Sequence, residues 1–331
     1  MSNQSNKIYD VYGLGNALVD MEFEVTPETL NDLGIEKGVM TLVDEARQAE
    51  ILTTLNRPAS QQTGGGSAAN TLVTLSRLGG KGFYSCKVAS DPTGNVFLTD
   101  LAAAGLDTNW QQQSPPEGIT GKCLVFVTPD ADRSMNTFLG ITSEISPTEL
   151  VPAALTASKY LYMEGYLVSS PTGKAAAIAA RDLAGAQGVK TSFSLSDLTM
   201  TQFFREGLLE IIGNGLDLLF ANEAEALGLC QTEQLEDAIA GLKHYAKQFV
   251  ITRGAQGSLV YDGQTLLEIA AVPVQAIDTN GAGDTYAGAF LYGLTQGMTA
   301  AQAATLGARA AAELVTQLGA RLTPEQLQRL S

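Results

Sequence analysis

Strand-like and helix-like patterns of apolar residues alternate along most of the chain after about residue 80. This order is typical of a mostly parallel α/β sheet whose two faces are covered by helices. Active sites in such sheets lie beyond the carboxyl ends of the strands. The predicted strands are residues 83–88, 160–163, 191–195 and 216–220. The predicted helices between them are residues 96–104, 174–183 and 203–212.

Two segments outside this alternation combine strand-like runs with turns. Residues 23–26 and 39–43 predict two strands that are separated by a turn. Residues 123–127 and 135–139 predict a hairpin around a turn at 129–132. We expect these strands to form a lid rather than part of the core.

The segment Asp-Thr-Asn-Gly-Ala-Gly-Asp at 278–284 has a different periodicity on each side. Alternating apolar residues at 272–276 predict a strand before it, and apolar residues at helical spacing from Ala287 predict a helix after it. Gly281 and Gly283 then lie at the turn, where they leave the amides of the helix start unobstructed. A helix start with free amides is a binding site for a phosphate.

Asp284 lies at this predicted anion site, where its carboxylate would repel an anion unless it has a chemical role. A carboxylate next to a bound phosphoryl group can accept the proton of an attacking hydroxyl. The alternative is that the two glycines only make a turn and that Asp284 complements the helix dipole.

The segment 278–284 resembles the C-terminal signature of the ribokinase-like (PfkB-type) carbohydrate kinases, and Asn280 within it is most similar to the adenosine kinases of that family. Other segments resemble further motifs, in the family's order, between residue 13 and about residue 321. They are Gly-Asn-Ala-Leu-Val-Asp at 15–20, Gly-Gly-Gly-Ser-Ala-Ala-Asn at 64–70, Asn-Glu-Ala-Glu at 222–225 and Thr-Arg-Gly-Ala-Gln-Gly at 252–257.

The resemblance implies a single ribokinase-like kinase domain over residues 1–331. That fold is a three-layer α/β/α sandwich with a mostly parallel central sheet and a small β-sheet lid. The lid would come from about 18–45 and 112–143, and the large α/β domain from the remainder.

On the acceptor side, the resemblance implies contacts from the first two motifs. Asn16 and Asp20 would hold the ribose-like part, since a carboxylate can accept hydrogen bonds from two neighbouring hydroxyls. Gly65 and Gly66 would lie against the acceptor, and Asn70 would bind a sugar hydroxyl. Taken alone, these residues also fit a solvated acid at a strand edge and a flexible turn.

The same part of the chain bears on the choice of acceptor. Ser67 is the predicted N-cap of the helix that carries Asn70. Met40 and Tyr166 would supply the flat apolar walls that a nucleobase needs, which together with Asn280 favours adenosine over a bare sugar. Fructose, ribose or another nucleoside are the alternatives.

On the donor side, no phosphate-loop consensus occurs in the sequence, so ATP must be held in another way. By resemblance, a glycine turn after residue 252 would contact phosphate or ribose, and the helix at 300–318 would pack beside the adenine. The residues expected to contact ATP are Asn222, Thr252, Gly254, Gly257, Gly281 and Gly283.

Asn222 and Glu225 follow a predicted strand and lie one turn apart at the start of a helix. By resemblance they belong to the hydration shell of a magnesium ion on the phosphates. The competing interpretation is a capped helix with acids in its first turn, and both can be true. Dependence on a monovalent cation such as K⁺ stays open.

The resemblance also implies the roles of the residues around the reacting atoms. Asp284 would deprotonate a primary hydroxyl, and the amides of Gly281, Ala282 and Gly283 would stabilise the phosphoryl charge. Arg133 would assist from the lid, although a surface arginine is the alternative. A nucleoside or nucleotide sensor without turnover is the competing class of function, and an intact Asp284 argues against it.

Composition excludes several other classes of protein. The 331 residues carry a formal charge of −15, which disfavours a nonspecific nucleic-acid or anionic-membrane binder. The 3 cysteines fit neither a disulfide framework nor a zinc cluster, and the only histidine, His244, lies in a predicted surface helix. The start of the chain has no apolar stretch typical of a signal peptide. We therefore expect a cytoplasmic monomer or homodimer that binds small molecules.

Overall fold

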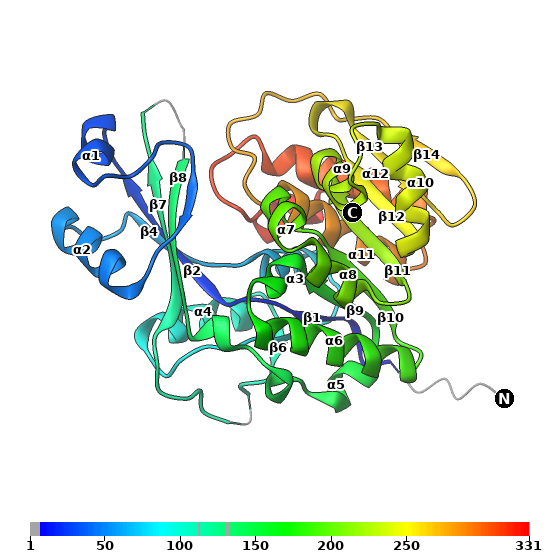
Figure 1. Cartoon of the computed structure of the whole chain (residues 1–331), viewed down its shortest axis with the longest axis horizontal. Helices are drawn as coiled ribbons and strands as arrows, with labels where there is room; N and C mark the ends of the chain where they lie inside the picture. The colour runs from blue at the N-terminus through cyan, green and yellow to red at the C-terminus, as the bar shows by residue number, and fades with distance from the viewer. Residues whose placement is uncertain (1–6, 112, 130–132, 331) are drawn as a thin grey trace.

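The chain folds into two β-sheets of different size, as a computed structural model describes for residues 7–111, 113–129 and 133–330 (Figure 1). The larger sheet has nine strands, and all neighbouring strands from β6 to β12 are parallel, whereas β13 and β14 are antiparallel. The prediction of a mostly parallel α/β sheet is confirmed. Across the sheet the strands are β14 (Leu266–Ile269), β13 (Ser258–Tyr261), β12 (Ala246–Thr252), β11 (Leu216–Asn222), β10 (Lys190–Ser194), β9 (Ser158–Glu164), β1 (Tyr9–Leu14), β5 (Gly82–Ser85) and β6 (Asp107–Thr108).

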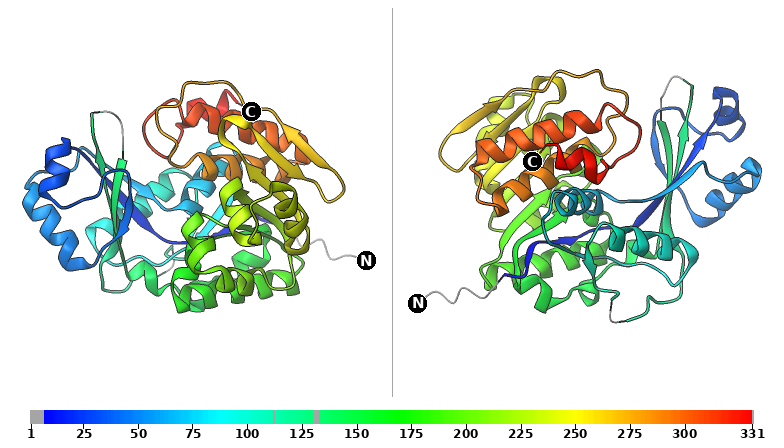
Figure 2. Two further views of the ribbon diagram at one scale, coloured as in Figure 1. Left: turned by 45° about the horizontal axis from the view of Figure 1, so that its top comes forward. Right: turned by 180° about the vertical axis from the view of Figure 1, so that it is seen from behind.

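Helices cover both faces of this sheet and complete three layers (Figure 2). The first face is covered by α5 (Pro152–Thr156), α6 (Pro171–Ala186), α7 (Leu198–Phe203), α8 (Arg205–Ile212), α9 (Glu223–Cys230) and α10 (Leu235–Tyr245). The second face is covered by α3 (Ser67–Arg77), α4 (Pro92–Ala103), α11 (Ala282–Thr295) and α12 (Ala300–Leu314). The short helix α13 (Pro324–Gln328) packs beside α3 and α12.

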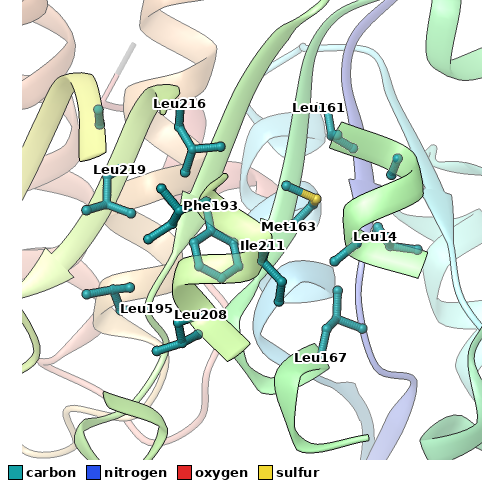
Figure 3. Close-up of a cluster of buried hydrophobic side chains, with 14 of the residues drawn as sticks. Leu14, Leu161, Met163, Leu167, Phe193, Leu195, Leu208, Ile211, Leu216 and Leu219 are labelled. Carbon is teal, nitrogen blue, oxygen red and sulfur yellow. The ribbon is translucent and has the colours of Figure 1, made fainter. Parts of the chain in front are cut away.

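The central strands are apolar on both sides because each side faces a helix layer. On β9, Leu161 and Met163 pack with Phe193 and with Ile211 of α8 (Figure 3). Tyr160 and Tyr162 of the same strand point to the opposite layer. Side chains alternate along a strand, so one short run of apolar residues fills both cores.

The smaller sheet forms the lid and projects from one end of the molecule (Figure 1). Its strands are β3 (Met40–Leu42), β8 (Arg133–Gly140), β7 (Thr120–Val127), β2 (Leu18–Glu24) and β4 (Gln61–Gly65). The helices α1 (Pro27–Asp32) and α2 (Glu45–Leu55) cover its outer face over a small core that includes Phe23, Leu30 and Phe126. Strand β4 lies outside the segments 18–45 and 112–143 from which we expected the lid.

Two local predictions were wrong. Residues 272–276 form no strand: the segment is irregular, with Val272 and Val274 about two-fifths exposed. Residues 30–34, expected as a turn, are helical up to Asp32, because the helix α1 begins with Pro27 at its first position and Thr26 caps it by accepting from the Thr29 amide.

The predicted hairpin is confirmed in its two strands, which are antiparallel β7 and β8, while most of its expected turn at 129–132 lies outside the described residues. Within the part of the chain that the structure describes, no helix is long and apolar enough to cross a membrane.

Candidate active site

The predicted motifs meet at the carboxyl ends of the parallel strands. Asn16 follows β1, Glu164 ends β9, Asn222 ends β11 and Thr252 ends β12. The N-terminus of α11, which carries the 278–284 segment, lies at the same edge of the sheet and lines a cavity together with Asn222 and Thr252. This position is the one expected for the active site of an open α/β sheet.

The start of α11 leaves most of its amides free. Gly281 is the N-cap residue, and its left-handed conformation, with φ of 74°, is one that glycine adopts without strain. Its carbonyl accepts from the Thr285 amide at 2.8 Å, which begins the helix. Among the described residues, the amides of Gly281, Gly283 and Asp284 have no acceptor.

Ala282 does not fit the expectation that three successive amides, those of residues 281 to 283, bind the phosphoryl group. Its amide donates to the carbonyl of Thr279 at 3.2 Å, as part of a tight turn. The free set is therefore formed by Gly281, Gly283 and Asp284. All three residues line a cavity, and a Cβ at Gly283 would meet no atom within 4 Å.

Two cavities meet at this helix start. The smaller, of about 250 Å³, contains Asp284, Asn222 and Glu225 in its wall. The larger, of about 710 Å³, lies between the glycine turn after β12 and the α12 helix. Both are lined by Thr252, Thr279, Ala282, Gly283 and Tyr286. A molecule in the larger cavity can therefore place an anionic end against the free amides.

Asp284 is half-buried in the smaller cavity and held on both oxygens. Its Oδ1 accepts from the Ser67 hydroxyl at 2.6 Å, and its Oδ2 accepts from the Asn70 side-chain amide at 3.3 Å. Burial raises the pKa of Asp284 to about 6, although these two hydrogen bonds and Arg321 act in the opposite direction. The carboxyl group is ionised at neutral pH and can accept a proton there.

Ser67 is not the N-cap of α3, contrary to the prediction. Gly66 occupies that position with φ of 92°, and Ser67 is the first residue of the helix. The hydroxyl of Ser67 is therefore free of the capping hydrogen bond and binds Asp284 instead.

Each glycine of the 64–66 run is required for a different reason. A Cβ at Gly64 would collide with the carboxylate of Asp100, and one at Gly65 would lie 2.5 Å from Oδ1 of Asp20. One at Gly66 would lie 2.6 Å from the carbonyl oxygen of Asn16. The run brings two carboxylates and the first motif close to the start of α3.

Asn16 and Asn70 are both buried at this junction. The backbone of Asn16 is fixed by its amide, which donates to Oε1 of Glu164 at 2.8 Å, and by its carbonyl, which accepts from the Tyr84 hydroxyl at 2.9 Å. Oε2 of Glu164 accepts from the Ala68 amide at 2.8 Å. Glu164 thus joins the two acceptor motifs, and its burial raises its pKa to about 7.

Asp20 lies on the lid face that is turned toward the main domain. Burial raises its pKa to about 6, while the charges of Arg321 and Arg133 lower it. Its neighbour across the parallel β2–β7 pair is Cys123, so Cys123 and Val125 share its face of the lid. The acceptor motif therefore combines a carboxylate with an adjacent apolar strip.

Arg133 joins the lid to the main domain. Its Nη2 lies 3.1 Å from Oδ2 of Asp278 and 3.5 Å from Oε2 of Glu22, and all three side chains are largely buried. The guanidinium is therefore held at the first residue of the 278–284 segment. Its predicted contact with the transferring phosphoryl group stays a prediction.

The two expected apolar walls have different positions. Tyr166 lines the smaller cavity with Asp284 and Asn222, close to the predicted site of transfer. Met40 lies on β3, the outermost lid strand, with 39% of its surface exposed. Its partner in the parallel β3–β8 pair is Met135, which pairs with Val125, so Met40 extends the apolar strip beside Asp20.

Asn222 and Glu225 form a reciprocal cap at the start of α9. The Asn222 side chain accepts from the Glu225 amide at 2.8 Å, and Glu225 accepts from the Asn222 backbone and side chain at 3.0 and 2.7 Å. Both residues also line the smaller cavity, and burial raises the pKa of Glu225 to about 7. The capping interpretation is confirmed. The carboxylate also fits a magnesium ion held through water beside the free amides.

The larger cavity is lined by a glycine turn and by small apolar side chains. Gly254, with φ of 54°, and Gly257, with φ of 85°, make the turn after β12 on one side. On the other side, Ala308, Ala311 and Val315 present small apolar side chains from α12 and the residue after it. This lining suits a purine base, and Thr252 belongs to the walls of both cavities.

Several site residues were missed by sequence reasoning. They are Ser67, Glu164, Glu22 and Arg321, each of which contacts or lies beside a predicted residue. Glu164 could have been found as an acid at the end of a predicted central strand. No local pattern points to Arg321, because its role depends on contacts with residues about 220 to 250 positions earlier.

Comparison with known proteins agrees with this geometry. The chain is 27% identical to the adenosine kinase of Saccharomyces cerevisiae over 95% of this chain and 97% of the relative. Among solved structures, the adenosine kinase of Sinorhizobium meliloti is 37% identical, with a TM-score of 0.87 over 97% of this chain and 98% of that one. A probable sugar kinase from Rhizobium etli is 34% identical, also with a TM-score of 0.87, over 97% of each chain.

The model of the pfkB family of carbohydrate kinases matches residues 42–327, which is most of the chain. That match includes the glycine run of β4, the Asn222 cap and the anion site of α11. The chain belongs to the pfkB carbohydrate kinase family and is a kinase.

Proposed function

We propose that this kinase transfers the γ-phosphoryl group of ATP to a primary hydroxyl, with the 5′-hydroxyl of adenosine as the preferred acceptor. One observation carries the proposal: the Asp284 carboxylate lies between the acceptor motifs and the free amides at the start of α11. A base and an anion site at this junction are what in-line transfer to an alcohol requires.

Different residues of the site bind the donor, accept the proton, stabilise the phosphoryl charge and hold the metal. Thr252 and the glycine turn hold the donor in the larger cavity, so that its γ-phosphoryl group meets the amides of Gly281 and Gly283. Asp284 accepts the proton of the attacking hydroxyl, and the amides stabilise the charge on the transferring group. Asn222 and Glu225 would hold magnesium through water, and the ion would neutralise phosphate charge.

The charges around the acceptor site favour an uncharged acceptor. Asp20, Glu22, Asp100 and Asp284 contribute four carboxylates, whereas two arginines, Arg321 and Arg133, lie beside them. A sugar acid would meet repulsion from this set, whereas the hydroxyls of a nucleoside or sugar can donate to it.

The apolar strip of the lid favours a nucleoside over a bare sugar. Cys123, Val125, Val127 and Met135 pack together on the face that carries Asp20. A flat base could lie on this strip while its ribose reaches the carboxylate. The adenosine kinases among the relatives support the same choice.

A sugar acceptor is the second candidate, because the probable sugar kinase from Rhizobium etli is similar over nearly the whole chain. The test is ADP formation from Mg-ATP with adenosine, inosine, ribose or fructose, each supplied separately. The proposal predicts the highest kcat/KM for adenosine. A higher kcat/KM for ribose or fructose than for adenosine would favour a sugar kinase. Binding in a thermal-shift assay without ADP formation from any of the four acceptors would favour a sensor.

A further inference from the structure

Arg321 is a buried cation in the acceptor region that no predicted motif contains. It follows α12 in the C-terminal segment, and its side chain is only 9% exposed. From there it reaches α3, where its Nε donates to Oδ1 of Asn70 at 2.7 Å, and α4, where its Nη1 pairs with Asp100. The side chain therefore connects three segments that are distant in the sequence.

The contact with Asn70 fixes which way that side-chain amide faces. An arginine can only donate, so the atom of Asn70 that faces Nε must be the oxygen. The amino group of Asn70 is then directed to the opposite side, where it donates to Oδ2 of Asp284 at 3.3 Å. The hydrogen bond from Arg321 thereby fixes the orientation in which the Asn70 amino group faces Asp284.

The third nitrogen of the Arg321 guanidinium, Nη2, is unpaired within the part of the chain that the structure describes. This nitrogen is also buried. A buried unpaired donor is destabilising, so such groups are rare in native structures and each one needs an explanation, of which a bound ligand is one. The charge of Arg321 acts on both Asp20 and Asp284, so the guanidinium lies near the two carboxylates that define the acceptor site.

The glycine run supports this location. A Cβ at Gly64 would collide with Asp100 and lie 3.3 Å from Nη1 of Arg321. The ion pair is thus packed directly against β4, one residue before Gly65, whose missing Cβ makes room for Asp20. The absence of a Cβ at Gly64 leaves space for the Arg321–Asp100 ion pair, and its absence at Gly65 leaves space for the Asp20 carboxylate.

We propose that Arg321 is a specificity-determining residue of the acceptor site, which orients Asn70 through Nε and donates from Nη2 to a ring hydroxyl oxygen of an uncharged polyol. This inference rests on the proposed function. Asp20 accepts from the hydroxyls, while Asn70 and Arg321 donate to their oxygens. An acceptor that lacks the hydroxyl leaves Nη2 unpaired, so the site discriminates against deoxy compounds.

The test combines variants with acceptor analogues. Binding of adenosine, 2′-deoxyadenosine and 3′-deoxyadenosine is measured by calorimetry for the wild type and for Arg321→Gln, and KM is measured for each acceptor and for ATP. We expect Arg321→Gln to weaken adenosine binding at least about tenfold with the KM for ATP unchanged. We also expect one deoxy analogue, bound poorly by the wild type, to lose most of that penalty in the variant.

Arg77→Gln is the matched control. Arg77 donates to the carbonyl of Leu322, the residue after Arg321, so it helps to hold the same segment without touching the acceptor motifs. We expect its acceptor preferences to equal those of the wild type. If Arg321→Gln fails to fold, Arg321→Lys serves instead, because it keeps the charge opposite Asp100 but cannot make all three contacts.

The outcomes separate this inference from the proposed function. Equal penalties for the deoxy analogues in wild type and variant would overturn the role of Arg321 and leave the kinase assignment intact. If the wild type prefers ribose or fructose, the binding of that sugar and of its deoxy forms is compared between the wild type and Arg321→Gln in the same way. If the wild type binds no acceptor at all, both the inference and the proposed function are wrong.

Discussion

Three carboxyl groups of the candidate site, those of Asp284, Glu164 and Asp20, share a raised pKa, but each is held in a different way. Asp284 accepts from Ser67 and Asn70, whereas Glu164 accepts from two backbone amides. Asp20 faces two arginine charges. Because burial dominates in every case, these groups become ionised only as the pH approaches neutrality.

This property predicts the pH dependence of the reaction. With a pKa of about 6, Asp284 is protonated below that pH and cannot accept the hydroxyl proton. We therefore expect kcat/KM for the acceptor to rise with pH around 6 and to become constant above about 7.5. Steady-state rates between pH 5 and 9 measure this, and a kcat/KM that stays constant over the whole range would contradict a base with a pKa of about 6.

At the scale of elements, the β4 strand shapes the site by lacking side chains, whereas the start of α9 shapes it through side-chain hydrogen bonds. Strand β4 contributes through the absence of side chains, because Gly65 leaves room for Asp20. Helix α9 contributes through a reciprocal cap between Asn222 and Glu225. Single substitutions in these two elements should therefore affect different substrates.

Gly65→Ala tests the role of β4. The new Cβ would lie 2.5 Å from Oδ1 of Asp20, so the carboxylate must move away from the acceptor. We expect the KM for the acceptor to rise by at least about tenfold, with the KM for ATP within twofold of wild type. Gly185→Ala in α6 is the control, since nothing lies within 4 Å of its Cβ and the change should stabilise the helix by about 0.5–1 kcal/mol.

A pair of substitutions at Glu225 separates capping from metal binding. Glu225→Gln keeps a residue that forms capping boxes but removes the charge, so we expect a near-normal Tm and a higher magnesium requirement. Glu225→Ala removes both, so it should also lower stability by about 1 kcal/mol. Thermal unfolding and magnesium titration of the rate measure the two effects. An unchanged magnesium requirement in both variants would leave only the capping role.

For the whole molecule, the ion pair between Arg133 and Asp278 is the contact that ties the lid to the anion site. Arg133 belongs to the lid strand β8, and Asp278 also accepts from the amides of Asn280 and Gly319 in the main domain. One guanidinium therefore couples the position of the lid to the 278–284 segment.

Arg133→Gln should weaken this coupling. We expect faster amide hydrogen exchange in β7 and β8 and a fall in kcat of roughly 10²-fold, the usual effect of losing a charged group near a transferring phosphate. Arg57→Gln is the control, because within the described ranges the hydrogen bond of this exposed lid arginine goes to the carbonyl of Glu24. Unchanged exchange and kcat in Arg133→Gln would remove the lid arginine from the mechanism.

The alternating apolar pattern was sufficient to predict the parallel sheet, because strands buried on both faces and amphipathic helices have distinct periodicities. It failed at 272–276, where alternating valines are exposed beside the larger cavity rather than paired in a sheet. Asp284 and the glycines could be predicted from a local turn. Arg321 could not be assigned, since its contacts arise only when distant segments pack together.

The measurement that tests the account most directly is the rate of ADP formation from saturating Mg-ATP and adenosine for the wild type and Asp284→Asn at pH 8. The substitution keeps the size of the side chain and removes its basicity. The account predicts a fall in kcat of at least about 100-fold, with both KM values within about threefold of wild type. Equal kcat values would contradict the assignment of Asp284 as the base that activates the acceptor hydroxyl.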